Sequence, residues 1–199
     1  LTIDDRGLIY TVTQGAGRTG LKKFNLAGIN ILDDTRVDNN VADVAIGQIE
    51  NIFVVSSDGY IYEYSREGDL LFLFGGRDDG KDRSGLFVSA VAIDVDSSGN
   101  LYVLDSESNK IQIFGKTEYA ELVHQALTLY QQGKYIESKE PWEEALRQNS
   151  LFDYANKGLG QAYYKLEQYD EALTAFRLGG DKDGYSSAFW EVRNIYLKD

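Results

Sequence analysis

Residues 41–75 read VADVAIGQIENIFVVSSDGYIYEYSREGDLLFLFG, and this stretch predicts a unit of four short β-strands. Its apolar runs alternate with polar residues and are separated by the turn signals Asp58-Gly59 and Arg66-Glu67-Gly68. Asp-Gly between two alternating aromatic runs indicates a two-residue hairpin of type I′, because that turn needs positive φ at both central residues. The stretch therefore predicts an antiparallel sheet that begins near residue 41.

The same pattern recurs on both sides of this unit. Residues 1–34 contain LTI, LIYTVTQ, a Gly-rich turn, GLKKFNL and INILDD, and residues 88–115 contain VSAVAIDV, LYVLDS and KIQIFG. Aromatic residues fall at equivalent places, with Tyr10, Phe53 and Tyr102 in the second strands and Phe24, Tyr64 and Phe114 in the third strands. Repeats of about 40–50 residues with three or four strands each are typical of propeller blades.

The third unit contains the most specific motifs. These are Gly85-Leu-Phe, Ala90-Val-Ala-Ile-Asp, Gly99-Asn-Leu-Tyr-Val-Leu-Asp and Asn109-Lys-Ile-Gln-Ile-Phe. With them, residues 1–115 resemble the NHL-repeat β-propeller family. The resemblance implies about three blades of an incomplete propeller and a binding role rather than chemistry.

Residues 116–199 change to helical periodicity. Several positions that lie 34 residues apart match in type, namely Ala126 and Gly160, Tyr135 and Tyr169, Ser138 and Ala172, and Trp142 and Phe176. This spacing is the period of tetratricopeptide (TPR) repeats, which this part of the chain resembles. The small residues let two helices approach closely, Trp142 and Phe176 fill the gap between them, and Gly133 ends a helix because glycine tolerates positive φ.

The repeat predicts helices over residues 118–131, 136–148, 152–166, 170–178 and 186–197, which are two repeats plus a fifth helix. Gly179-Gly180 is expected to end the fourth helix, and Trp190 falls where the first-helix tryptophan of a third repeat belongs. Pro141 leaves two alternatives open: either Ser138 caps the second helix and leaves Pro141 in the first turn, or the helix kinks there. The fold class is thus multidomain, all-β followed by all-α.

In TPR arrays the first helix of each pair lines the concave face. The positions that follow from this rule are Val123, Leu127, Tyr130, Lys157, Gln161 and Tyr164. We expect these side chains to form a groove for a protein or peptide partner. Only Lys157 echoes the basic clamp that some TPR domains use, so the groove favours a mixed apolar and polar peptide over an acidic tail.

Charge and composition narrow the function classes. The net charge is −12, and both halves of the chain are acidic, so binding to phosphate backbones is disfavoured. There is no cysteine, which excludes disulfides, thiol catalysis and zinc-thiolate sites. We expect no cofactor. The weak metal candidate is Asp94, Asp96 and Ser98, which resemble the start of a calcium loop but lack its closing glutamate, and a simple turn explains them better.

An enzyme is not expected, because the only histidine, His124, lies in a helical stretch and the propeller half has none. The alternative function is a propeller that binds a carbohydrate or another small ligand, or a metal-dependent, gluconolactonase-like lactone hydrolase. Tyr60, Tyr62 and Tyr64 share one strand face and could stack on a sugar, although alternating aromatic residues in a strand more often pack in a core.

The sequence therefore predicts a non-catalytic interaction scaffold that is a fragment of a longer protein. The combination of propeller blades with TPR-like helices resembles bacterial cell-surface or membrane-tethered proteins. We therefore expect an extracytoplasmic location, with any membrane tether outside these residues. The open ends of a three-blade array are association hazards. Preceding blades could complete the ring, which we favour for the natural protein, two copies could meet by an isologous contact, or the helices could cap the blades. We expect the 199 residues alone to self-associate.

Overall fold

The computed structural model of the chain describes residues 1–13, 20–32 and 40–197. Two compact units follow one another, Leu1–Gly115 built of β-strands and Lys116–Asp199 built of helices. Within the described ranges, no helix combines the length and the apolar character needed to cross a lipid bilayer. The predicted Gly-rich turn and the end of the INILDD segment lie outside the described residues.

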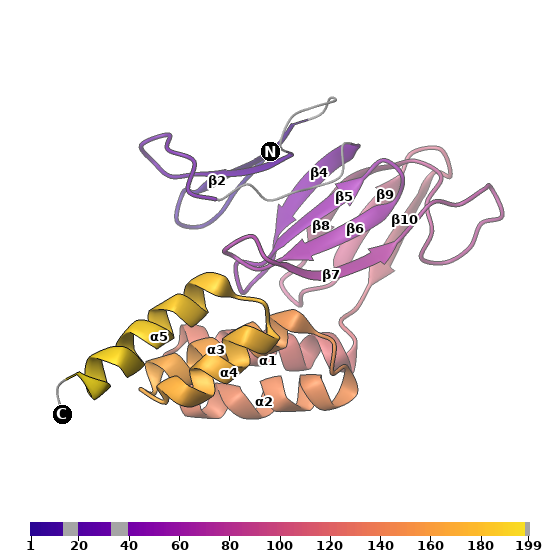
Figure 1. Cartoon of the computed structure of the whole chain (residues 1–199). Coiled ribbons are helices and arrows are strands. Elements are labelled where there is room, and N and C mark those ends of the chain that lie inside the picture. Colours follow the sequence, from indigo (N-terminus) through magenta and orange to yellow (C-terminus); the bar gives the residue numbers. More distant parts are fainter. Residues whose placement is uncertain (14–19, 33–39, 198–199) are drawn as a thin grey trace. The chain divides into compact units, whose positions relative to one another are not determined.

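Three small antiparallel sheets make up the described part of the first unit (Figure 1). The first sheet contains β1 (Thr2–Ile3), β2 (Ile9–Val12) and β3 (Leu21–Phe24). The second contains β4 (Val41–Ile46), β5 (Ile52–Ser56), β6 (Tyr60–Tyr64) and β7 (Leu70–Gly75). The third contains β8 (Ala90–Val95), β9 (Leu101–Asp105) and β10 (Lys110–Phe114). The chain turns helical after β10, and the described residues hold no fourth strand of the third sheet. The described part of INILDD, residues 29–32, includes an isolated bridge between Phe24 and Asn30.

The turn at Asp58-Gly59 differs from the prediction. Gly59 has φ +83° and Asp58 does not have positive φ, so the turn is not of type I′. The loop has three residues, 57–59, and the Gly59 N–H donates to the Ser56 carbonyl at 2.9 Å. This is the longer hairpin form, a turn followed by one residue in the left-handed region. Only glycine fits there, since a Cβ on Gly59 would lie 2.5 Å from the Gly76 carbonyl oxygen.

Two apolar cores join neighbouring sheets. The core between the first two sheets consists of Tyr10, Leu21, Leu32, Val41, Val44, Ile52, Val54 and Tyr64. The core between the second and third sheets consists of Ala45, Phe53, Val55, Ile61, Phe87, Ala90, Ile93, Leu101 and Val103. The strand register places the predicted aromatic residues at equivalent positions of the three sheets. The repeat in the sequence is therefore a repeat of sheet geometry.

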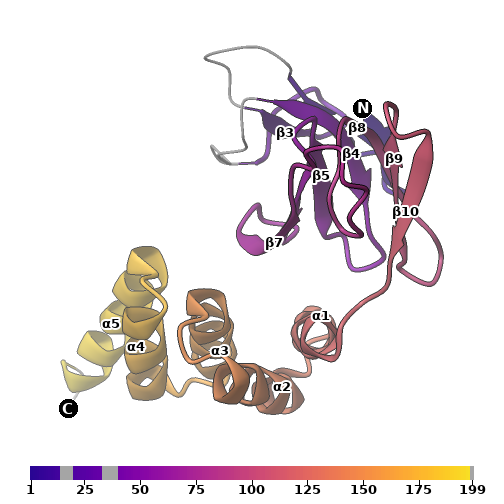
Figure 2. The same cartoon turned by 90° about the vertical axis from the view of Figure 1, so that its right-hand side faces the viewer.

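Five helices form the described part of the second unit, and Figure 2 shows them following one another in chain order. They are α1 (Glu118–Gln131), α2 (Tyr135–Gln148), α3 (Asp153–Lys165), α4 (Tyr169–Leu178) and α5 (Lys182–Tyr196). The first four match the predicted ranges within one residue, and α4 ends before Gly179-Gly180 as expected. The fifth begins four residues earlier than the predicted residue 186.

Pro141 lies well inside α2, which begins at Tyr135. The Ser138 hydroxyl donates to the Tyr135 carbonyl at 2.8 Å, and the side chain is fully buried. Capping of α2 by Ser138 is therefore wrong. Because proline has no N–H, the bond from residue 141 to the carbonyl four residues back is missing within the helix.

Candidate functional site

The predicted groove residues divide into a buried and an accessible set. Val123 is 0% and Leu127 is 8% exposed, so both are core residues of the helical unit rather than an open lining. The prediction that they line a groove is wrong for these two positions, because both side chains are used for packing. Tyr130 on α1 remains partly exposed.

The accessible set lies on α3. Lys157, Gln161 and Tyr164 are all partly exposed, and their spacing of four and three residues places them on one face of the helix. The rest of α3 is largely buried, through Tyr154, Ala155, Asn156, Gly158, Leu159, Gly160 and Ala162. Lys157 Nζ lies 5.9 Å from the Tyr154 ring centroid, which holds the ammonium close to an aromatic surface. This α3 face presents an ammonium, an amide and a phenol side by side.

Both helical pairs end their first helix with the same turn. Tyr130 packs on Tyr135 with ring centroids 5.2 Å apart, and Tyr164 packs on Tyr169 at 5.5 Å. Gly133 has φ +76° between the first pair of rings. Glu167, which stands at the same place in the second pair, adopts φ +60° although it is not glycine. The second turn thus keeps the geometry of the first, although Glu167 replaces the glycine that favours it.

The aromatic residues predicted to plug the helical pairs are buried. Trp142 is 1% exposed and Phe176 is 3% exposed. A Cβ on Gly158 of α3 would lie 2.5 Å from Trp142 Cε2, and one on Gly160 would lie 2.5 Å from Phe176 Cδ1. The close contact of Gly160 lies at a predicted small position, whereas the close contact of Gly158 was not predicted. The other predicted small repeat positions, Ala126 and Ala172, are fully buried.

The fifth helix does not repeat the packing of α3. Trp142 rests on Gly158, 16 positions later in the chain (158 − 142), whereas Phe176 rests on Gly184, only 8 positions later (184 − 176). Trp190 is 56% exposed and contacts Arg193, whose guanidinium carbon is 4.9 Å from its ring centroid. Trp190 was expected to stand where the first-helix tryptophan of a third repeat belongs, but it is not packed as Trp142 is, because the short α4 lets α5 start early and shifts its register.

The weak calcium candidate is a turn. The Asp96 carboxylate accepts hydrogen bonds from the Ser98 N–H at 2.8 Å, from the backbone and side-chain N–H groups of Asn100, both at 2.8 Å, and from the Tyr102 hydroxyl at 3.2 Å. Bonds from Asn100 lead the effects that lower the pKa of Asp96. Asp94 accepts only from the adjacent Val95 N–H among the contacts described. Within the described ranges, no group of three or more His, Asp or Glu residues could hold a metal ion.

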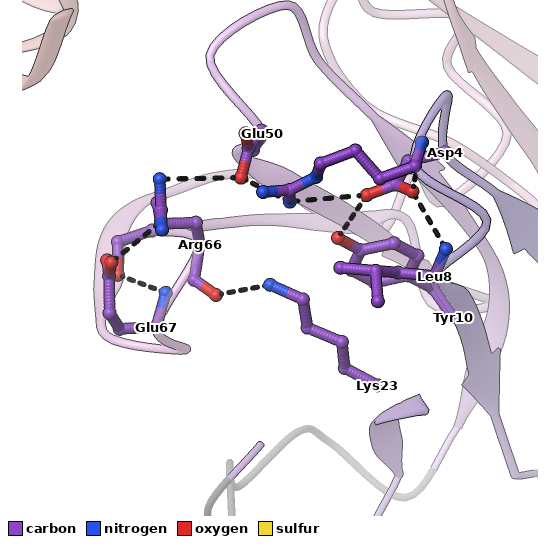
Figure 3. Close-up of polar contacts among 9 residues, drawn as sticks. Asp4, Leu8, Tyr10, Lys23, Glu50, Arg66 and Glu67 are labelled. Carbon is purple, nitrogen blue, oxygen red and sulfur yellow. Dashed lines mark hydrogen bonds and ion pairs between the residues drawn. The ribbon is translucent and has the colours of Figure 1, made fainter. Parts of the chain in front are cut away.

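A second turn of the same kind lies in the first sheet and extends into a polar cluster (Figure 3). Asp4 accepts from the Leu8 N–H at 2.9 Å and from the Tyr10 hydroxyl at 3.1 Å, which repeats the pair of Asp96 and Tyr102. Burial is the largest effect on the Asp4 carboxyl, but these hydrogen bonds outweigh it and lower its pKa. Burial and the Asp4 charge raise the pKa of Tyr10.

The cluster continues from the first sheet to the second. Arg6 Nη2 lies 2.5 Å from Glu50 Oε2, and Arg66 Nη1 lies 3.6 Å from the same oxygen. Lys23 is only 6% exposed and donates to the Arg66 carbonyl at 3.0 Å. Burial and the nearby Arg6 charge lower the pKa of Lys23. A lysine with a lowered pKa can serve as a nucleophile, but here the amine is engaged and the cluster fastens one sheet to the next.

The sequence did not reveal the role of Asp105. Its carboxylate is 1% exposed and accepts from the N–H groups of Val88 at 2.8 Å, Ser89 at 3.1 Å and Ser108 at 3.2 Å. Burial alone would raise the pKa of Asp105, but these bonds outweigh it and lower the pKa. Asp105 thus ties the segment before β8 to the turn after β9. The position of Asp105 at the end of the Gly99–Asp105 motif was the one feature of the sequence that could have indicated this role.

The tyrosines of β6 mostly pack inside the unit. Tyr64 is 2% exposed and Tyr62 stacks on it with ring centroids 6.2 Å apart, whereas Tyr60 is 39% exposed. The three side chains therefore do not form one open stacking surface. His124 is buried in α1.

Comparison with known families finds one match. Residues 87–114 match the family described as NHL repeat, which spans the third sheet together with Phe87. The NHL repeat predicted in this part of the chain is confirmed. Such a repeat is typical of a β-propeller or protein-interaction type of domain. A comparison with curated proteins found no match.

Proposed function

We propose that the protein is a non-catalytic interaction scaffold in which a partial NHL-like propeller precedes a TPR-like helical array. The NHL match at residues 87–114 and the shared register of the three sheets support the first part. Two helical pairs with equivalent tyrosine contacts and equivalent aromatic plugs support the second part. The sheet register, the tyrosine contacts and the aromatic plugs each stabilise the fold. The polar contacts described above for the sheet unit likewise connect parts of that unit.

The α3 face is the proposed binding surface, and its three adjacent accessible side chains are the observation that carries the proposal. Lys157 can pair with a carboxylate or a backbone carbonyl, Gln161 can both donate to and accept from a peptide backbone, and Tyr164 offers an aromatic surface with a hydroxyl at its edge. Tyr130 lies one repeat earlier than Tyr164 and adds a second phenol. This combination suits a peptide of mixed polar and apolar character.

Selection from a displayed library of random dodecapeptides tests this proposal. We expect the full chain to select peptides that contain both apolar and polar residues. These peptides should lose at least about tenfold in affinity when Gln161 and Tyr164 are both replaced by alanine, because such surfaces depend on a few aromatic anchors. Ile136→Ala is the matched control, since this α2 residue is 66% exposed and lies outside the α3 face.

Failure to select any peptide, or selected peptides that bind the double variant as well as the wild type, would contradict the assignment of the α3 face. Circular dichroism of the double variant shows whether the helices are intact. The expected extracytoplasmic location stays a prediction.

A further inference from the structure

Each sheet of the first unit has two faces that can be defined by register. The front faces contain Tyr10, Val12, Leu21 and Lys23 in the first sheet, Phe53, Val55, Ile61 and Glu63 in the second, and Tyr102, Leu104, Ile111 and Ile113 in the third. The rear faces contain Ile9, Thr11, Lys22 and Phe24, then Ile52, Val54, Tyr62 and Tyr64, then Leu101, Val103, Gln112 and Phe114. Members of each set occupy equivalent positions of paired strands.

Inside the unit a front face always packs on the rear face of the next sheet. Tyr10 and Leu21 of the first front face share a core with Ile52 and Val54 of the second rear face. The core between the second and third sheets repeats this arrangement one sheet later. Front on rear is therefore the established contact of this fold.

The front face of the third sheet has no covering sheet in the described residues. Ile111 is 61% exposed, whereas its equivalents Ile61 and Leu21 are 0% and 2% exposed. Leu104 is 39% exposed, and its equivalent Val55 is fully buried. The residues are as apolar as those of the buried front faces, which indicates a face made for the same kind of contact.

The rear face of the first sheet also has no sheet packed on it in the described residues, and it is the kind of face that a front face contacts inside the unit. Its strand residues Ile9, Thr11 and Phe24 are partly exposed, whereas the equivalents of Ile9 and Thr11 in the other two sheets are buried. Each unfilled face has one charged residue in the paired strands: Lys22 lies on this rear face, and Asp94, opposite Tyr102, lies on the third front face. The two faces thus match in apolar pattern and are opposite in charge.

We propose that the front face of the third sheet binds the rear face of the first sheet in a second copy of this chain. The contact continues the internal front-on-rear packing from one copy to the next, so two different faces meet. If the rotation between sheets lets two copies close a ring, the pair has two-fold symmetry and contains this contact twice; otherwise the copies form an open series. The association uses the sheet unit alone and is independent of the α3 face.

Analytical ultracentrifugation of the full chain and three single variants tests the proposal. Ile111→Glu blocks the front face, because it places a carboxylate at the position equivalent to Ile61, which is buried in the internal contact. Thr11→Glu blocks the rear face, and in the free chain its carboxylate lies opposite Lys22 across the strand pair, which favours folding. Leu73→Glu is the matched control, since Leu73 is 52% exposed on the outer strand β7.

We expect the wild type and Leu73→Glu to associate, and each blocked variant to weaken association by about a hundredfold or more, because the new carboxylate would be buried in the contact: unpaired in Ile111→Glu, and in Thr11→Glu next to Lys22, whose charge is then no longer available to Asp94 of the second copy. An equimolar mixture of the two blocked variants should form one-to-one pairs, since each variant keeps one intact face. A wild type that stays monomeric at about 100 μM, a mixture that stays monomeric, or loss of association in Leu73→Glu would overturn the proposal. Far-UV circular dichroism establishes that each variant is folded.

Discussion

Replacement of Trp142 tests how the helical unit is held together. The indole is 1% exposed, it contacts Gly158 of α3 so closely that a Cβ there would lie 2.5 Å from Cε2, and its ring is 5.8 Å from that of Tyr154. Trp142→Ala removes this side chain from between two helices. We expect a loss of about 3–5 kcal/mol in the free energy of unfolding, as for other buried aromatic residues.

Replacement of Trp142 by phenylalanine should behave differently. Trp142 Nε1 is buried without a hydrogen-bond partner among the described residues, and such an unsatisfied donor costs about 1–3 kcal/mol. Phenylalanine removes this donor, which offsets the cavity left by the smaller ring. The second helical pair already has Phe176 at the position 34 residues later. We therefore expect Trp142→Phe to change the free energy of unfolding by no more than about 1 kcal/mol.

Urea unfolding of the full chain, followed by ellipticity at about 222 nm, which reports mainly on the helices, measures these differences. Trp190→Ala is the control, because Trp190 belongs to the same unit but is 56% exposed. It should cost less than about 1 kcal/mol. The reasoning is refuted if Trp142→Ala also costs less than about 1 kcal/mol, or if Trp142→Phe is as destabilising as Trp142→Ala.

Three further changes probe other parts of the chain. Glu167→Gly should stabilise the helical unit by about 1 kcal/mol in the same assay, because Glu167 has φ +60° and glycine adopts this conformation without strain; a loss of stability would contradict this. Gly160→Ala should destabilise by about 1–3 kcal/mol, since the new Cβ would lie 2.5 Å from Phe176, and an unchanged midpoint would show that the ring moves freely. Asp105→Asn should cost about 1.5–3 kcal/mol in thermal or urea unfolding of the sheet unit, because an amide N–H would face the backbone donors. The folded pKa of Asp105 is lowered, so its contribution is present above the unfolded pKa of about 4 and is lost as the pH falls through the folded value. The wild type should therefore lose more stability on acidification below about pH 4 than Asp105→Asn does, and equal losses would assign the acid sensitivity to other groups.

Local features of the sequence predicted most elements of the fold. The helix over residues 118–131 and the end of α4 before Gly179 follow from short-range periodicity and glycine placement, which act within a few residues. The turn at Asp58-Gly59 was predicted in place but not in type. The same two residues fit either hairpin form, and the structure has the three-residue loop with positive φ at Gly59.

The candidate site was predicted only in part. Periodicity placed Lys157, Gln161 and Tyr164 on one helix face, but it could not show that Val123 and Leu127 are buried. Whether a position at a given helical angle is open depends on how the neighbouring elements pack against it. That information comes from contacts between distant segments.

The sequence by itself indicated that a β region is followed by a helical region, because alternation, period and turn residues act locally. Only the tertiary structure decided which side chains pack between one helical pair and the next helix. It placed Phe176 against Gly184 and left Trp190 exposed, since the length of α4 sets where α5 begins along its neighbour. It also assigned Ile111 to an open face and its equivalent Ile61 to a core, because identical strand patterns differ in burial according to which sheet lies beside them.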